Sequence, residues 1–108
     1  MNESQALRAL GALAQETRLQ IVRYLVRAGM QGAAAGEIGQ EVGASSSRLS
    51  FHLSALENAG LVSSERISRT IVYRASFESL GGLIAFLLDD CCNNHPAICA
   101  CCNVGKTV

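Results

Sequence analysis

The chain has 108 residues, 49% of them hydrophobic and 17% charged, with nine basic residues balancing nine acidic ones. This composition fits one globular domain and excludes a disordered chain, and the zero net charge gives no overall attraction to nucleic acid or membrane. No apolar run is long enough to span a bilayer and the first residues do not form a secretory signal, so we expect a cytoplasmic protein with no membrane partner.

Four helices are predicted before residue 61. Residues 2–14 place Leu7 and Leu10 one turn apart, as in a short amphipathic helix. We expect Thr17 to cap a second helix, which ends at two glycines. A third helix covers residues 35–42 and stops at Gly43, and a serine opens a fourth helix over residues 46–59. The apolar stripe of the second helix consists of Leu19, Val22, Leu25, Val26 and Met30.

A hairpin and a last helix follow. Residues 61–67 and 70–75 are predicted to form two strands around a tight turn, and in the second, Ile71, Tyr73 and Ala75 alternate with Thr70, Val72 and Arg74 as in a half-buried strand. Residues 77–90 form a helix that is apolar nearly all round, and such a helix needs more than one burial surface. Because a chain of this length offers one core, we assign the second surface to another copy and expect a homodimer.

This order of elements predicts a mainly α, winged helix-turn-helix fold. The third and fourth helices form the helix-turn-helix unit, and the hairpin after them forms the wing. We therefore expect residues 1–90 to form a DNA-binding and dimerisation domain. Residues 91–108, which hold all five cysteines, form a separate C-terminal tail.

The fourth helix carries side chains suited to reading double-stranded DNA in the major groove. At 100° per residue, three leucines fall on one side and face the core. Small hydroxyls, an aromatic ring, an imidazole and a guanidinium gather on the other side, where they can contact bases and phosphates. The alternative is an ordinary solvated helix face, against which an outward Phe51 and the wing both argue. The expected reading residues are Ser47, Arg48, Ser50, Phe51, His52 and Ser54.

Two arginines, Arg66 and Arg69, lie near the predicted hairpin tip, where a wing reaches phosphates or the minor groove. The alternative is that they are ordinary exposed arginines. The neutral net charge predicts modest non-specific affinity, so we expect binding to depend on a dimer that doubles the contacts.

Three segments resemble the arsenic-repressor (ArsR/SmtB) family of winged-helix metalloregulators. They are Glu16-Thr17-Arg18-Leu19, Ser47-Arg48-Leu49-Ser50-Phe51-His52-Leu53 and Ala59-Gly60-Leu61-Val62. The resemblance covers residues 5–90 and implies a homodimer joined by its terminal helices. It also implies operator binding in the apo state and release when an effector binds.

The resemblance extends to single positions, with two departures. Ser47, Ser50, Phe51, His52 and Ser54 match the recognition-helix positions of the family, and Arg69 matches a basic wing-tip residue. The usual wing glycine is absent from the turn at residues 67–70. The third helix lacks the Cys-x-Cys of some members, so the sensor must lie elsewhere.

The tail cysteines are candidate effector ligands. Thiolates select soft ions, and trivalent arsenic or antimony takes three of them in a pyramidal arrangement. Zinc, cadmium or lead is a competing effector, because His95, Cys99, Cys101 and Cys102 form a plausible zinc set. A thiol redox switch is a further alternative, as is a tail whose cysteines do nothing. Arsenic-responsive members of the family often carry a Cys-Cys pair just after the last helix, which favours As(III) or Sb(III).

Within the tail we expect Cys91, Cys92 and Cys99 to bind the effector. Cys91 follows the apolar helix at helical spacing, and the segment before Cys99 contains Pro96 and can fold back at little entropic cost. Cys101 and Cys102 lie nearer a chain end and are the weaker candidates. An enzyme is disfavoured, because neither histidine accompanies a nucleophile elbow, a phosphate loop or a zinc-hydrolase motif.

Overall fold

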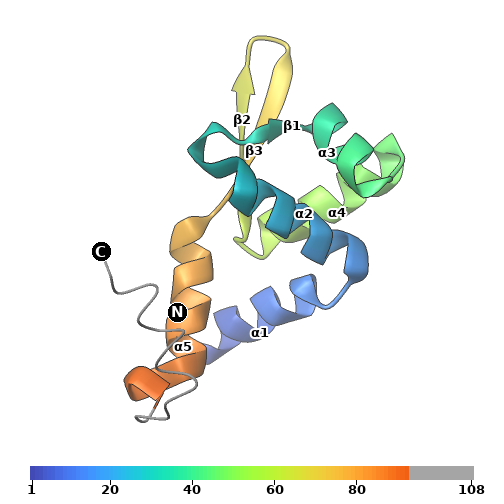
Figure 1. The fold of residues 1–108 in the computed structure, drawn as a ribbon. Helices are drawn as coiled ribbons and strands as arrows, with labels where there is room; N and C mark the ends of the chain where they lie inside the picture. Colours follow the sequence, from blue (N-terminus) through green and yellow to red (C-terminus); the bar gives the residue numbers. More distant parts are fainter. Residues whose placement is uncertain (93–108) are drawn as a thin grey trace.

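The computed structural model describes residues 1–92, with side chains through Leu88, and has the predicted winged helix-turn-helix fold (Figure 1). Helices dominate, and a small sheet projects from them. The elements in order are α1 (Glu3–Leu13), α2 (Glu16–Ala28), the 3-10 turn η1 (Gly29–Gln31), β1 (Ala33–Ala34), α3 (Ala35–Val42), α4 (Ser46–Asn58), β2 (Val62–Ile67), β3 (Thr70–Ala75) and α5 (Phe77–Cys92).

The helix boundaries follow local capping chemistry. Asn2 and Gln5 form a reciprocal capping box at the start of α1, with each side chain bonded to the other residue's backbone N–H. Gly43 ends α3 in the left-handed conformation that glycine adopts without strain. The expected cap of α2 is wrong: the helix begins two residues earlier, and the Gln15 side chain accepts from the Arg18 N–H in place of Thr17.

The core lies where α2, α3 and α4 meet the base of the hairpin, and α1 closes it from below in the view of Figure 1. Its largest fully buried side chains are Ile21, Leu25, Ile38, Leu53, Leu56 and Leu61. The expected faces of the first two helices need correction. Helix α1 buries Ala6, Ala9 and Ala12 and leaves Leu7 and Leu10 exposed, because small residues allow close packing. Of the stripe expected for the second helix, Leu19 and Val26 of α2 are exposed, and so is Met30, which lies in η1 beyond the end of α2.

The sheet has three antiparallel strands in the order β1-β3-β2. The hairpin strands have the predicted positions, and their register pairs Val62 with Ala75 and Ile67 with Thr70. The short strand β1, which the sequence did not predict, pairs Ala33 with Tyr73 and so ties the chain between α2 and α3 to the wing. Strand β3 of the wing is therefore hydrogen-bonded along both edges, to β1 and to β2.

The wing turn contains a backbone conformation that reflects its missing glycine. Ser68 has φ 60°, in the left-handed region, and is the only non-glycine with a positive φ in the described part of the chain. Arg74 anchors the base of the wing: its Nη1 pairs with Glu65 Oε1 at 2.7 Å, and its Nε donates to the Met30 carbonyl at 2.7 Å. The hairpin therefore projects from the helices, and the contacts of Arg74 hold its base in place (Figure 1).

Gly32 is a backbone position that no other residue fits. It has φ 70° and ψ −165°, and a Cβ added there lies 2.5 Å from the Tyr73 carbonyl oxygen. Gly29 has a similar conformation, with φ 71° and ψ −152°, but an added Cβ meets nothing within 4 Å.

We predict that Gly32→Ala lowers the free energy of unfolding by about 2–3 kcal/mol, because backbone strain and a clash with β3 add together. Gly29→Ala is the matched control and carries the strain alone, so its destabilisation is smaller. Urea unfolding of both variants measures the difference. Equal destabilisation of the two variants contradicts the close approach of Gly32 to β3.

The terminal helices α1 and α5 carry several large apolar side chains that the single chain leaves exposed. Leu83 of α5 is buried, and α1 packs against α5. Leu7 of α1, however, is 63% exposed, and Ile84 and Leu87 of α5 are each 57% exposed. The prediction that α5 has more apolar surface than one chain covers is confirmed for its described side chains. Among residues 1–92, no helix has the length and apolar character needed to cross a membrane.

Candidate nucleic-acid interface

Helix α4 presents two distinct sides. Leu49, Leu53 and Leu56 are buried, as the helical spacing predicted. The opposite side faces solvent, and Phe51 at its centre is 65% exposed although it is a large aromatic residue. The exposed residues of this reading face are Ser47, Arg48, Ser50, Phe51 and Ser54. Their outward placement agrees with the sequence prediction.

The expected outward placement of His52 is wrong. Its side chain is only 7% exposed. It lies three residues after Leu49 and four before Leu56, so it shares the core-facing side of the helix. Burial of an imidazole requires a hydrogen-bond partner, and Arg18 from α2 supplies it. His52 therefore supports the reading face from beneath.

Arg18, Phe51 and His52 form a three-residue cluster that joins α2 to α4. The Arg18 Nε–H donates to His52 Nδ1 at 3.1 Å. The Arg18 guanidinium carbon lies 5.5 Å from the centroid of the Phe51 ring, within the range of a cation–π contact. The Phe51 and His52 rings meet edge to face at 5.6 Å. Sequence reasoning gave Arg18 no role, because its partners lie more than 30 residues along the chain.

The cluster requires a neutral imidazole. Nδ1 accepts a hydrogen bond only when it carries no proton. Burial, followed by the charges of Arg18 and then of Arg48, lowers the pKa of His52 below its ordinary value of 6.5. Both guanidinium groups therefore lie close enough to the ring to oppose a third positive charge.

This lowered pKa predicts a pH dependence of stability. Below about pH 6.5 the unfolded chain binds a proton at His52 that the folded chain does not, so the free energy of unfolding falls as the pH drops. Above pH 6.5 the contribution is complete and constant. Urea unfolding between about pH 5 and pH 7.5 checks this. His52→Asn should remove part of the slope, and an unchanged slope contradicts a neutral buried His52.

The reading half of α4 and the wing tip are free of acidic side chains. The first acid of the helix is Glu57, whose carboxylate accepts from the Ser64 hydroxyl at 2.6 Å, near the base of the wing. Arg66 and Arg69 are exposed, and Arg69 lies in the turn itself. In the part of the chain that the structure describes, Arg74 and Glu65 form the one ion pair, so neither wing-tip arginine is neutralised.

The predicted effector ligands lie at or beyond the limit of the described structure. The backbone of α5 continues through Cys91 and Cys92, two residues further than expected, but their side chains are outside the described set. Cys99, Cys101, Cys102 and His95 lie outside the described residues altogether. Within the described residues, no three His, Cys, Asp or Glu side chains are grouped to hold a metal ion.

Comparison with known proteins identifies the family. Residues 15–64 match the bacterial regulatory proteins of the arsR family. The chain is also 34% identical over 88 residues to the HTH-type transcriptional regulator YgaV of Escherichia coli, a match that covers 82% of this chain and 87% of YgaV. The chain belongs to the arsR family.

Solved structures of similar regulators have the same fold. An ArsR-like transcriptional regulator from Rhodococcus is 30% identical, with a TM-score of 0.67 over 79% of this chain and 76% of that one. The homodimeric winged helix-turn-helix DNA-binding domain of Mb0332 from Mycobacterium bovis is 31% identical, with a TM-score of 0.64 over 85% of each chain. As a member of the arsR family, the chain is a DNA-binding transcriptional regulator and not an enzyme.

Proposed function

We propose that this regulator represses arsenic-resistance genes in the cytoplasm. In this proposal the apo homodimer binds operator DNA through α4 and the wing, and it dissociates when As(III) or Sb(III) binds Cys91, Cys92 and Cys99. The single observation that carries the proposal is the position of the thiols. Two of the five cysteines, Cys91 and Cys92, end α5, the helix that carries exposed apolar side chains, and the other three follow within ten residues of it in the sequence.

The open apolar surface supports the homodimer. Leu7, Leu10, Ile84 and Leu87 are exposed on two helices that pack together, and soluble monomers rarely expose so many large apolar side chains in one region. The Mycobacterium bovis relative, which is homodimeric, provides a precedent. A twofold dimer also presents two reading helices, which compensates for the neutral charge of each chain.

The thiol chemistry supports trivalent arsenic or antimony. Three thiolates satisfy a pyramidal As(III) centre, and hard oxygen ligands do not replace them. A site next to α5 has a direct route to the operator, because a ligand that favours a dimer geometry unable to bind DNA shifts the population away from the operator complex. A methylated trivalent arsenical has two free valences and needs only one pair of cysteines.

A gel shift tests the proposal. The DNA is the region upstream of the protein's own gene, and the additions are As(III), methyl-As(III), Sb(III), Zn(II) and Cd(II) under reducing conditions. We expect release by As(III) or Sb(III) and none by Zn(II) or Cd(II). Release by zinc or cadmium alone identifies a divalent-metal sensor, and release only on oxidation identifies a redox switch. A complex that no addition releases contradicts an effector-regulated repressor.

A further prediction concerns the reading face of α4. Ser50→Ala combined with Phe51→Ala should weaken operator binding by about tenfold or more and reduce discrimination against a scrambled duplex, because the groups that touch base edges are removed. Both side chains are exposed, so the fold should be retained, which circular dichroism checks. Arg69→Ala should instead weaken binding to all sequences equally. Normal operator binding by the Ser50/Phe51 variant would place the reading face elsewhere.

A further inference from the structure

Arg18 lies at the edge of the reading face, on a different helix. We propose that its guanidinium binds a phosphate of the operator beside α4, and that His52 and Phe51 hold the guanidinium in position. This inference rests on operator binding by α4, which is part of the proposed function. It adds a residue of α2 to a surface otherwise built from α4 and the wing.

Two contacts fix the orientation of Arg18. Its Nε–H is used by His52 Nδ1, and its guanidinium lies over the Phe51 ring. Arginine carries five N–H donors, so the four on its two Nη atoms remain for a ligand. No hydrogen bond or ion pair within residues 1–88 engages these Nη atoms. A planar guanidinium fixed at one edge and open at the other matches the bidentate geometry of a phosphate.

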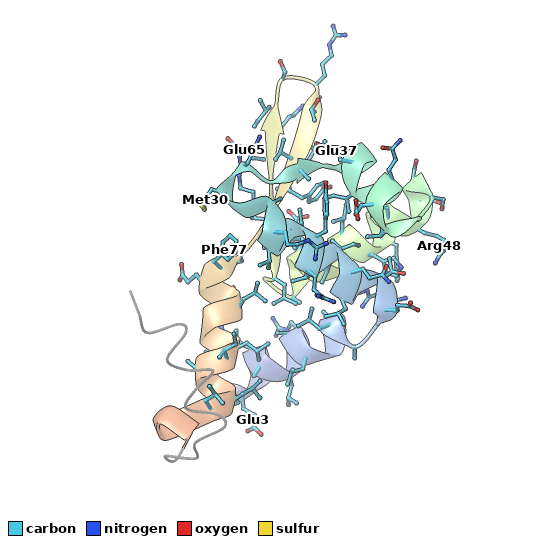
Figure 2. All side chains as sticks on the ribbon, in the orientation of Figure 1. Glu3, Met30, Glu37, Arg48, Glu65 and Phe77 are labelled. Atoms are coloured by element: carbon cyan, nitrogen blue, oxygen red, sulfur yellow. The ribbon has the colours of Figure 1, made fainter. Side chains whose placement is uncertain are left out.

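The position of the cluster points to DNA as the source of that phosphate. Phe51 is the most exposed aromatic residue of α4 and lies on its reading face, so a cation stacked on it borders the same face. Arg48 lies close enough to the cluster to add, with Arg18, to the positive field at His52. Figure 2 shows Arg48 projecting from the end of α4 that is remote from α5. A helix in the major groove has phosphates along both edges, where such flanking cations meet them.

Lysine could not replace Arg18 in this arrangement. A lysine ammonium is a single point donor and cannot bond His52 and grip a phosphate with a rigid fork at once. His52 in turn must keep an acceptor at the Nδ1 position. His52 is therefore a positioning residue, and Arg18 is the residue that contacts DNA.

Fluorescence anisotropy titrations of the full chain test the inference, with an upstream operator duplex and a scrambled duplex at several salt concentrations. Arg18→Gln should weaken both duplexes by about the same factor, on the order of tenfold. The slope of log affinity against log salt should shrink by about 0.9 for each phosphate that is no longer bound, and so by about twice that for a dimer. Arg8→Gln on α1 makes the same charge change beside the C-terminal end of α4 and should leave the slope unchanged.

Two further variants separate contact from support. Arg18→Lys keeps the charge, so it should keep most of the salt slope while losing part of the affinity. His52→Leu removes the acceptor, after which adding Arg18→Gln should cost little more, whereas His52→Asn offers an oxygen near the Nδ1 position and should restore the coupling.

An unchanged salt slope for a folded Arg18→Gln chain overturns the inference, because Arg18 would then act only on packing. Loss of operator discrimination without any change for the scrambled duplex overturns it too. A failure of the unaltered chain to bind either duplex is a distinct result, which removes the proposed function and this inference together.

Discussion

Replacing Leu87 or Ile84 by aspartate should convert the regulator to a monomer and abolish operator binding at concentrations where the unaltered chain is fully bound. Both side chains are 57% exposed in the single chain, so the fold tolerates the change. In a dimer they become desolvated, and burial of an unpaired carboxylate costs several kcal/mol. Because a dimer carries two copies, we expect a weakening of about 4 kcal/mol or more, which is about a thousandfold in the dimerisation constant.

Sedimentation velocity measures the oligomeric state, and thermal unfolding confirms that the monomer is folded. Met30→Asp is the matched control. Met30 is an even more exposed apolar residue, but it lies in η1, and Figure 2 places it near Phe77 at the start of α5 and away from α1 and the C-terminal half of α5. This control should remain dimeric. A dimer that survives both α5 variants means that the chain associates through another surface.

Local signals in the sequence predicted most of the fold. Glycines at residues 29, 43 and 60 adopt positive φ where helices were expected to end, and Ser45 precedes α4 as expected. In β3, Ile71, Tyr73 and Ala75 alternate with Thr70, Val72 and Arg74, so this strand can be recognised without its partner. Each of these features is determined by residues close together in the chain, so it can be predicted from the sequence alone.

The misplaced features depend on contacts between distant segments. Strand β1 consists of two alanines and forms because Gly32 lets the chain approach β3 closely. In α1 the pairs Ala6/Ala9 and Leu7/Leu10 have the same three-residue spacing, so the spacing alone does not say which pair is buried. The alanines are buried because their small side chains allow α1 to pack closely. The spacing of His52 from Leu49 and Leu56 does place it on the core side of α4, but its partner Arg18, which supplies the donor that a buried imidazole needs, lies on another helix. A helical projection of one segment does not show such partners.

The effector ligands were also predicted from their spacing in the sequence, and each of the three should be essential for the arsenite response. Cys91→Ser, Cys92→Ser and Cys99→Ser should each keep operator binding and lose the arsenite response. A hydroxyl is a hard ligand and does not replace a thiolate on As(III). Changes in the groups around metal ligands already cost about 10–100-fold in affinity, so loss of a ligand should raise the arsenite concentration for half release by on the order of 100-fold or more.

The helix itself explains why this site would control the dimer. Helix α5 continues through Cys92, and consecutive residues of an α-helix lie 100° apart around its axis. Two adjacent thiolates can therefore share one arsenic only if the last turn of α5 opens, and that turn begins within two residues of Leu87. We expect Cys101→Ser and Cys102→Ser to respond normally, as controls that remove a thiol from the same tail. If truncation after Ala100 instead abolishes release, the ligands are Cys99, Cys101 and Cys102, and the coupling to α5 must be indirect.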